Sequence, residues 1–130
     1  NNFVWEAMKC KKLVLFEPHF RRNYIHVKDI VKVFLFAIKN FNNLRSNVYN
    51  VGLSSANLTK LSLAKKIKKK IKSLRIEINN NKSDPDKRDY FVSNKKIEKK
   101  GFKASFTIEN GITELLKTYK SRKFKILNNY

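Results

Sequence analysis

Cysteine and glycine are scarce in this sequence of 130 residues, which has one cysteine and three glycines. Because Cys10 has no partner, the chain can form neither an internal disulfide nor a cysteine-rich zinc site, and a lone thiol suits the cytoplasm. The glycines are isolated from one another, which excludes both a Walker loop and a GxGxxG turn. His19 and His26 are seven residues apart, and lone histidines are far more often structural than metal ligands. We therefore expect a cytoplasmic protein without a metal site.

Long apolar segments are missing as well. The longest unbroken apolar run covers residues 33–38, whereas a membrane span needs roughly 18 residues. We therefore expect no membrane-spanning segment. The chain opens on Asn1 without an initiator methionine, so we interpret it as a segment of a longer protein that forms one domain, residues 1–130.

Positive charge is plentiful: 30 Lys and Arg face 10 Asp and Glu, for a formal net charge of +20. Such a charge makes nucleic acid the first partner to consider. However, 24 of these residues are lysine and only 6 are arginine, whereas surfaces that read phosphates and bases favour arginine. The lysines gather only in the segment KKIKKKIK, from Lys65 to Lys72, where Ile67 and Ile71 share one helical face. We interpret this segment as a surface helix, with a nucleic-acid or anionic-membrane patch as the alternative.

Helical and extended apolar patterns alternate along the chain. Five helices are expected. One covers residues 3–9, and a short one after Ser93 or Asn94 as the cap ends at Gly101. The other three begin at a capping residue: Asp29 caps a helix that runs through residue 41, Thr59 caps the lysine-rich helix, and Thr107 caps a helix that runs through residue 119. Strands or extended segments are expected over residues 13–16 (buried), 23–27, 47–51, 74–78 (half exposed) and 90–92, with a polar loop over residues 79–89. This order predicts a mixed α/β fold with short strands, whose apolar faces exceed what the segment buries alone.

Two arginines flank these elements in positions that suit anion binding. Arg22 precedes the second extended segment, and Arg88 lies in the polar loop. Two guanidinium groups that meet on a diphosphate could each contribute about 1.5–3 kcal/mol. Ordinary salt bridges, for instance of Arg88 with Asp86 or Asp89, are the alternative, and spacing alone favours them.

A catalytic tyrosine–lysine pair is not expected in this segment. The spacing YxxxK occurs as Tyr24–Lys28 and as Tyr119–Lys123, and on a helix it brings a lysine beside a tyrosine that acts as an acid or base. Tyr24 lies in an extended stretch, where residues four apart are well over 10 Å from each other. The second pair follows the last helix in a basic tail without a cofactor site, so we assign no catalytic residue.

Five motifs in order resemble the C-terminal half of the extended short-chain dehydrogenase/reductases, the NAD-dependent nucleotide-sugar epimerases and dehydratases. The strongest is RNYIHVKDI at residues 22–30, similar to the family's R-D/N-F/Y-I-H-V-x-D block. VYNVG at residues 48–52 and DKRDYFVS at residues 86–93 follow. Lys96-Ile97 with Gly101-Phe102, and then IENGI at residues 108–112, complete the series. The resemblance covers nearly the whole chain.

The resemblance implies a part of a Rossmann-type α/β fold. In this family an N-terminal Rossmann domain holds NAD or NADP and the catalytic YxxxK, and the C-terminal part closes over the nucleoside-diphosphate-sugar. The chain then corresponds to the substrate-binding part, a small mixed α+β lobe with short strands, and most of the Rossmann core is missing. The cofactor would be bound by that missing N-terminal part.

The same resemblance assigns substrate contacts to six residues. Asn2 corresponds to the asparagine at the head of the substrate helix, and the backbone N–H of Phe3 is expected near the diphosphate. Val14 and Phe16 match the strand that holds the nucleobase.

Arg22 matches a diphosphate-binding arginine. Arg88 matches the second basic position less closely, because many relatives have an arginine nearer to Ser83. His26 and Asp29 are interpreted as structural, the first packed beneath the site and the second as the helix cap.

The sequence thus leads to two main hypotheses and a third possibility. The first is the substrate-binding part of an NAD(P)-dependent nucleotide-sugar epimerase, dehydratase or reductase, which forms a homodimer through the missing part and binds neither membrane nor nucleic acid. The second is a basic nucleic-acid-binding module that uses the helix from Lys65 to Lys72. The third is a truncated relative without activity.

Overall fold

The structure is a computed structural model that describes residues 1–81, 83 and 86–121. The helices are α1 (Asn2–Cys10), α2 (Val27–Lys39), α3 (Phe41–Leu44), α4 (Lys60–Lys70), α5 (Lys95–Glu98) and α6 (Ile108–Lys120), with one 3-10 turn, η1 (Ser54–Ala56). The strands are β1 (Lys12–Leu15), β2 (Arg21–Asn23), β3 (Asn57–Thr59) and β4 (Arg75–Ile78). Strands β1 and β4 pair in parallel, whereas β2 and β3 pair antiparallel. The chain is therefore a mixed α/β fold with short strands, as the sequence predicts.

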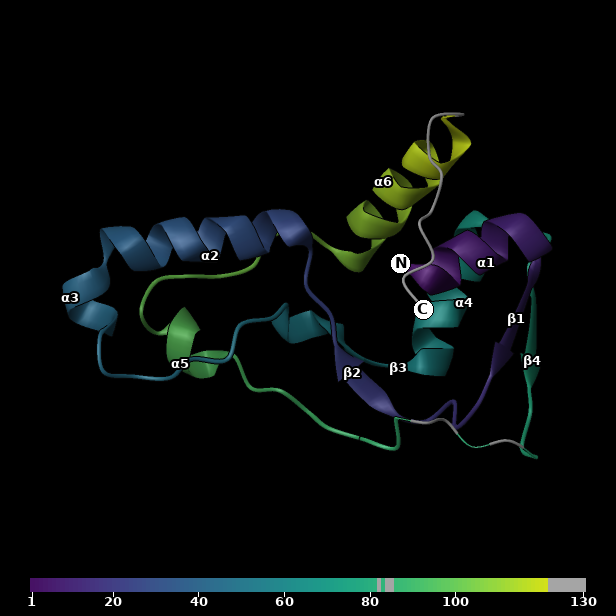
Figure 1. Cartoon of the computed structure of the whole chain (residues 1–130), viewed down its shortest axis with the longest axis horizontal. Coiled ribbons are helices and arrows are strands. Elements are labelled where there is room, and N and C mark those ends of the chain that lie inside the picture. The colour runs from purple at the N-terminus through teal and green to yellow at the C-terminus, as the bar shows by residue number, and fades with distance from the viewer. Residues whose placement is uncertain (82, 84–85, 122–130) are drawn as a thin grey trace.

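Most of the apolar core lies between three helices and the parallel strand pair. Helices α1, α4 and α6 contact one another, and α1 and α4 also contact β1 (Figure 1). Leu13 and Leu15 of β1 are fully buried in this core, whereas Val14 between them is 37% exposed. Successive strand residues point to opposite faces, so the helices cover only one face of the pair. The buried strand expected over residues 13–16 is present as β1, but only one of its two faces is buried.

Helices α2 and α3 extend away from this main core and pack on a second, smaller cluster beside α5 (Figure 1). One face of α2 and α3 carries a stripe of five apolar residues at alternating spacings of four and three, and each of them is more than half exposed. They are Val27, Val31, Phe34, Ile38 and Phe41. The sequence predicts such an excess of apolar surface. The longest described helices have 13 residues, and none in the described part of the chain is long and apolar enough to cross a membrane.

Local capping signals place several helix ends as expected. The hydroxyl of Thr59 accepts a hydrogen bond from Ser62 N at the start of α4. Thr107 and Asn110 form a reciprocal capping box at the start of α6. The sequence offers Ser93 or Asn94 as the cap of the short helix that ends at Gly101; Asn94 precedes α5 but makes no side-chain capping hydrogen bond. The turn after that helix passes through Gly101 with φ +100°, a conformation that favours glycine. These ends depend on neighbouring residues only, which is why the sequence predicts them.

Residues 47–51 and 24–27 depart from the predicted strands. The described structure has no strand over residues 47–51; Tyr49 and Val51 pack against the second cluster instead, and Val48 is exposed. A strand requires a partner for its backbone groups, and none of the described segments pairs with this one. The second predicted strand is β2, which begins earlier, at Arg21, and ends at Asn23.

Asp29 does not cap α2, contrary to the expectation from sequence. His26 is the capping residue, and its Nδ1 accepts a hydrogen bond from Lys28 N at 3.1 Å. Asp29 lies in the first turn, fully buried, and accepts hydrogen bonds from the backbone N–H groups of Ser105 and Phe106, both at 2.9 Å. This carboxylate therefore fixes α2 to the loop that enters α6, a tertiary role that its position in the sequence does not show.

Candidate functional site

Arg22 lies in β2 and directs its guanidinium into the loop at residues 86–88. Its Nη1 donates to the carbonyl oxygens of Arg21, at 2.8 Å, and of Arg88. Its Nη2 lies 3.1 Å from the carbonyl oxygen of Asp86 and 3.1 Å from Oδ2 of the same residue. The side chain is only 15% exposed, and its guanidinium lies 5.2 Å from the ring centre of Tyr90. Arg22 therefore fixes this loop through several charge-assisted hydrogen bonds.

Arg88 binds the same carboxylate from the solvent side. Its Nε and Nη2 donate to the two carboxylate oxygens of Asp86 at 2.7 and 2.8 Å, and its side chain is 76% exposed. The hydrogen bonds from Arg88 and the nearby charge of Arg22 hold the pKa of Asp86 well below its ordinary value. The two arginines, 66 residues apart in sequence, thus meet around one anionic group.

The structure contains both arrangements that the sequence suggests for Arg22 and Arg88, a shared anion site and an ordinary salt bridge. The two guanidinium groups converge, as a shared anion site requires, and the salt bridge between Arg88 and Asp86 also forms. Next to them, Arg21 makes a separate two-point contact with Asp89, with Nε and Nη2 at 3.1 Å from its carboxylate oxygens. This second pair attaches the same loop to β2.

The two residues expected to hold a nucleobase lie at the end of β1. Val14 lines a shallow polar hollow between β1 and β4. The carbonyl oxygen of Phe16 accepts a hydrogen bond from Nζ of Lys60, a buried lysine at the start of α4, at 2.7 Å. These contacts fix the backbone where β1 ends, and Phe16 does not line the cavity described next.

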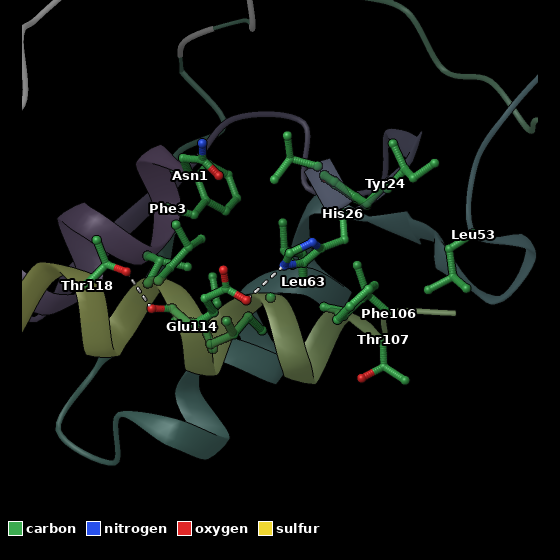
Figure 2. Close-up of a pocket in the computed structure, with 18 of the residues that line it drawn as sticks. Asn1, Phe3, Tyr24, His26, Leu53, Leu63, Phe106, Thr107, Glu114 and Thr118 are labelled. Atoms are coloured by element: carbon green, nitrogen blue, oxygen red, sulfur yellow. Dashed lines mark hydrogen bonds and ion pairs between the residues drawn. The ribbon is translucent and has the colours of Figure 1, made fainter. Parts of the chain in front are cut away.

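A cavity of about 430 Å³ opens between α1, α4, α6 and the segment that joins β2 to α2. Its walls are mainly apolar and include Phe3, Tyr24 and Phe106. Figure 2 shows Asn1 and Phe3 on one side of this space and Tyr24 and Leu53 on the other. Of the two helix-start residues expected to contact the diphosphate, Phe3 lines the cavity, and Asn2 is exposed at the start of α1.

His26 and Glu114 form the polar part of the cavity wall. Because Nδ1 of His26 accepts the hydrogen bond from Lys28 N, the proton of the neutral ring resides on Nε2, which lies 3.4 Å from Oε2 of Glu114 (Figure 2). The ring stacks on Phe106 with centroids 4.7 Å apart. Nζ of Lys28 also contacts Oε2 of Glu114, at 2.9 Å, and this hydrogen bond is the main cause that lowers the pKa of Glu114.

Tyr24 connects the cavity to the two arginines. It lines the cavity and follows Arg22 by two residues in an extended stretch, so both side chains lie on the same side of the backbone. Burial raises the pKa of Tyr24, and the positive charge of Arg22 acts in the opposite direction, which reflects the proximity of the two groups. The arginine cluster and the cavity are therefore neighbours.

Two contacts of functional residues are absent from the sequence-based prediction. The sequence offers Asp86 as a partner of Arg88, and that salt bridge forms, but it does not indicate that Arg22 binds the same carboxylate. Glu114 contacts His26 from α6, 88 residues away, and no motif in the sequence marks it. Among the described residues, no group of three metal-ligating side chains is present. Of the two YxxxK pairs, Tyr24 is in an extended stretch, and Lys123 lies outside the described residues.

The lysine-rich segment is a surface helix with one buried face. Ala64 and Ile67 of α4 are fully buried in the main core, whereas Lys65, Lys68 and Lys69 are exposed. The lysines of this helix are therefore solvated on the face opposite to the core, as the simpler interpretation predicts.

Several solved nucleotide-sugar enzymes share this fold, although no protein-family model matches the sequence. A GDP-D-glycero-L-gluco-heptose synthase from Campylobacter jejuni, solved in the presence of NADPH, superposes with a TM-score of 0.70 at 20% identity, over 89% of this chain and 35% of its own. A dTDP-glucose 4,6-dehydratase from Bacillus anthracis, solved in complex with NAD, has a TM-score of 0.70 at 20% identity, over 94% of this chain and 38% of its own. A GDP-mannoheptose C4 reductase from Campylobacter jejuni, solved with NADP bound, has a TM-score of 0.69 at 22% identity, over 85% and 34%.

This chain spans about a third of the length of these enzymes. All three are extended short-chain dehydrogenase/reductases, the family whose motifs the sequence resembles. Within the shared third, the short strands and the helices of this chain superpose on theirs over most of its length. The chain therefore has the fold of part of an extended short-chain dehydrogenase/reductase.

Proposed function

We propose that this chain is the C-terminal, substrate-binding part of an NAD(P)-dependent enzyme that acts on a nucleoside-diphosphate-sugar. In this proposal Arg22 and Arg88 bind the diphosphate, Val14 and Phe16 hold the base, and Asn2 and Phe3 border the diphosphate at the start of α1. The reaction is an epimerisation, a dehydration or a reduction of the sugar. Binding energy from the remote nucleotide would then orient the sugar for the reaction.

The observation that carries this proposal is the meeting of two guanidinium groups around one carboxylate. Arg22 and Arg88 both contact Asp86 within 3.1 Å. A diphosphate offers the same kind of oxygen pair with more negative charge, so it can replace the carboxylate on these donors. The class of ligand comes from the solved structures with the same fold, because their names contain GDP- or dTDP-linked sugars as product or substrate.

Replacing Arg22 with alanine should weaken nucleotide binding by about 2 kcal/mol or more, which corresponds to roughly 30-fold in Kd. The measurement is isothermal titration calorimetry of the natural polypeptide that contains this chain with UDP, GDP and dTDP, with the tightest ligand carried forward. Arg88→Ala, which alters an exposed side chain and so leaves the fold intact, should weaken the same ligand about tenfold.

The matched control is Arg21→Ala, because Arg21 is an adjacent arginine of β2 that makes a similar ion pair, with Asp89 instead of Asp86. Its affinity should stay within threefold of the parent protein. Equal losses in the Arg21 and Arg22 variants, or none in either, would contradict the assigned role.

The dinucleotide cofactor does not fit the described part of this chain. A dinucleotide site requires a glycine-rich turn between a parallel strand and a helix. Strand β1 leads into residues 16–20, and β4 leads into residues 79–81; in the described part of the chain neither strand is followed directly by a helix or a glycine. We therefore assign NAD or NADP, together with catalysis and the contacts of a homodimer, to other parts of a longer cytoplasmic protein.

Binding to duplex DNA distinguishes the proposal from the alternative, a nucleic-acid-binding module that uses the lysines of α4. Our proposal predicts weak binding to duplex DNA at 150 mM salt, measured by fluorescence anisotropy of a labelled 20-base-pair duplex. Tight binding with the steep dependence on salt concentration that several phosphate contacts produce would favour the alternative. The variant Lys68→Ala, on the exposed face of α4, would then reduce that dependence.

A further inference from the structure

Lys60 is a buried charged residue that the proposed diphosphate contacts leave unexplained. It is the first residue of α4 and is only 8% exposed. Lysine is seldom buried, because taking an ammonium group out of water costs free energy unless hydrogen bonds and charges compensate for it. An exposed lysine of the same helix, such as Lys68, has no such cost. A lysine at this buried position therefore indicates a specific role.

The ammonium group of Lys60 lies behind the segment that joins β1 to β2, residues 16–20. Its Nζ donates a hydrogen bond to the carbonyl oxygen of Phe16 at 2.7 Å and lies 5.4 Å from the ring centre of Phe20. A charged donor makes the hydrogen bond to Phe16 stronger than one between neutral groups. The side chain of Lys60 thus contacts the first and the last residue of this short segment.

The backbone at the start of α4 holds the same segment. The N–H group of Lys60 donates to the carbonyl oxygen of Phe20 at 3.1 Å, and the N–H group of Leu61 donates to that of Pro18 at 3.0 Å. These N–H groups belong to the first turn of the helix, where no carbonyl of the helix itself can accept from them. The start of α4 and residues 16–20 therefore form one hydrogen-bonded unit.

The end of β1 needs this support because its backbone is strained. Glu17, the residue after Phe16, has φ +45°, in the left-handed region that is unfavourable for residues other than glycine. Such a conformation persists only where the surrounding contacts hold it. The hydrogen bond from Lys60 fixes the peptide group between Phe16 and Glu17, directly beside the strained residue.

The start of α4 is also connected to the strand that carries Arg22. Arg22 of β2 lies opposite Leu58 of β3, and β3 continues into α4 without an intervening residue. Lys60 therefore stands between the two parts of the proposed site. Its backbone extends the strand that pairs with β2, and its side chain reaches the end of β1 at Phe16.

We infer that Lys60 is a positioning residue for nucleotide binding. Its buried ammonium group holds the end of β1 relative to β2 so that one ligand can contact Phe16 with its base and Arg22 with its diphosphate. The inference rests on the proposed function and deepens it, because it assigns the alignment of these two contacts to a residue that acts through the backbone of Phe16.

The test compares inorganic pyrophosphate, which can occupy only the arginines, with a nucleoside diphosphate, which reaches both contacts. Each is titrated calorimetrically into the natural polypeptide that contains this chain, with NAD and NADP in excess to occupy a dinucleotide site. UDP, GDP and dTDP are the nucleotides, and the tightest one is carried forward. In the parent protein we expect the Kd of pyrophosphate to exceed that of the nucleotide at least tenfold.

Lys60→Met should weaken nucleotide binding about tenfold and leave pyrophosphate binding within twofold, because methionine has a similar volume but cannot donate to Phe16. The matched control is Lys65→Met, the same change at an exposed position of α4, which should alter neither affinity. Urea denaturation shows whether each variant folds. If Lys60→Met does not fold, Lys60→Gln takes its place, because the shorter neutral side chain also removes the charged donor, and the same selective loss is expected.

The outcomes separate this inference from the proposed function. Unchanged nucleotide binding in the Lys60 variant, an equal loss of both affinities, or a parent protein without preference for the nucleotide would overturn the role of Lys60 and leave the arginine site standing. If the parent protein binds neither pyrophosphate nor any of the nucleotides, the proposed function itself is wrong. A loss confined to the nucleotide, with Lys65→Met unaffected, supports the inference.

Discussion

Asp29→Ala should lower the free energy of unfolding by about 3 kcal/mol, one of the two largest effects that the structure leads us to expect. The carboxylate is fully buried and accepts hydrogen bonds from the backbone N–H groups of Ser105 and Phe106 and from the hydroxyl of Ser105. Alanine leaves these donors without their acceptor, at a cost of about 1–3 kcal/mol for each buried group. Chemical denaturation with urea, followed by circular dichroism, measures the change.

Asp29→Asn is the conservative comparison. An amide of the same shape has one oxygen that can still accept, so about half of the loss should remain. Lys32→Ala tests the ion pair alone: its Nζ lies 3.5 Å from Oδ1 of Asp29 and is half exposed, and exposed partners contribute little. If Asp29→Ala and Lys32→Ala have the same small effect, the carboxylate does not fix α2 to the loop before α6.

The stability that Asp29 supplies should depend on pH. Burial alone favours the neutral acid, but the N–H groups of Phe106 and Ser105 outweigh it, and the pKa of Asp29 lies below its ordinary value. Since the folded-state pKa is the lower one, this contribution is complete above the unfolded-state pKa and is lost as the pH falls through the folded-state pKa. Urea denaturation from pH 7 down to pH 2 should therefore show a smaller loss of stability for Asp29→Asn than for the parent protein.

Ile67→Ala should also cost about 3 kcal/mol of unfolding free energy. Ile67 is fully buried in the main core between α4 and the neighbouring helices, and truncation of a buried isoleucine removes its apolar contacts and leaves a cavity. Thermal and urea denaturation of the two proteins measure the difference.

Lys68→Ala is the matched control for Ile67→Ala. It lies next in sequence on the exposed side of the same helix, and exposed substitutions usually change stability by less than about 0.5 kcal/mol. A small effect of Ile67→Ala, similar to that of Lys68→Ala, would mean that the helix does not pack on the core.

The sequence predicts most helices of this chain because their signals are local. The period of apolar residues and the caps at Thr59 and Thr107 lie within a few residues of the elements that they define. The order of the motifs, among them the nine residues from Arg22 to Ile30, also predicts the fold that the solved relatives have. The predictions that are wrong concern contacts between distant segments. Residues 47–51 have the alternation of polar and apolar side chains that is typical of a strand, but a strand forms only where another segment pairs with it.

The sequence by itself determined the fold class, the family resemblance and the exposure of the lysine-rich helix face to solvent, because each follows from short motifs or apolar periods and from their order along the chain. Only the tertiary structure decided that Arg22 and Arg88 meet at Asp86, that Asp29 is buried under the loop before α6, and that Glu114 faces His26. The contacts of Arg22 with Asp86, of Phe106 with Asp29 and of His26 with Glu114 join residues between 64 and 88 positions apart, and local patterns carry no information on such pairs. Tertiary packing therefore decides which residues of the site contact one another, whereas several of those residues can be identified from the sequence alone.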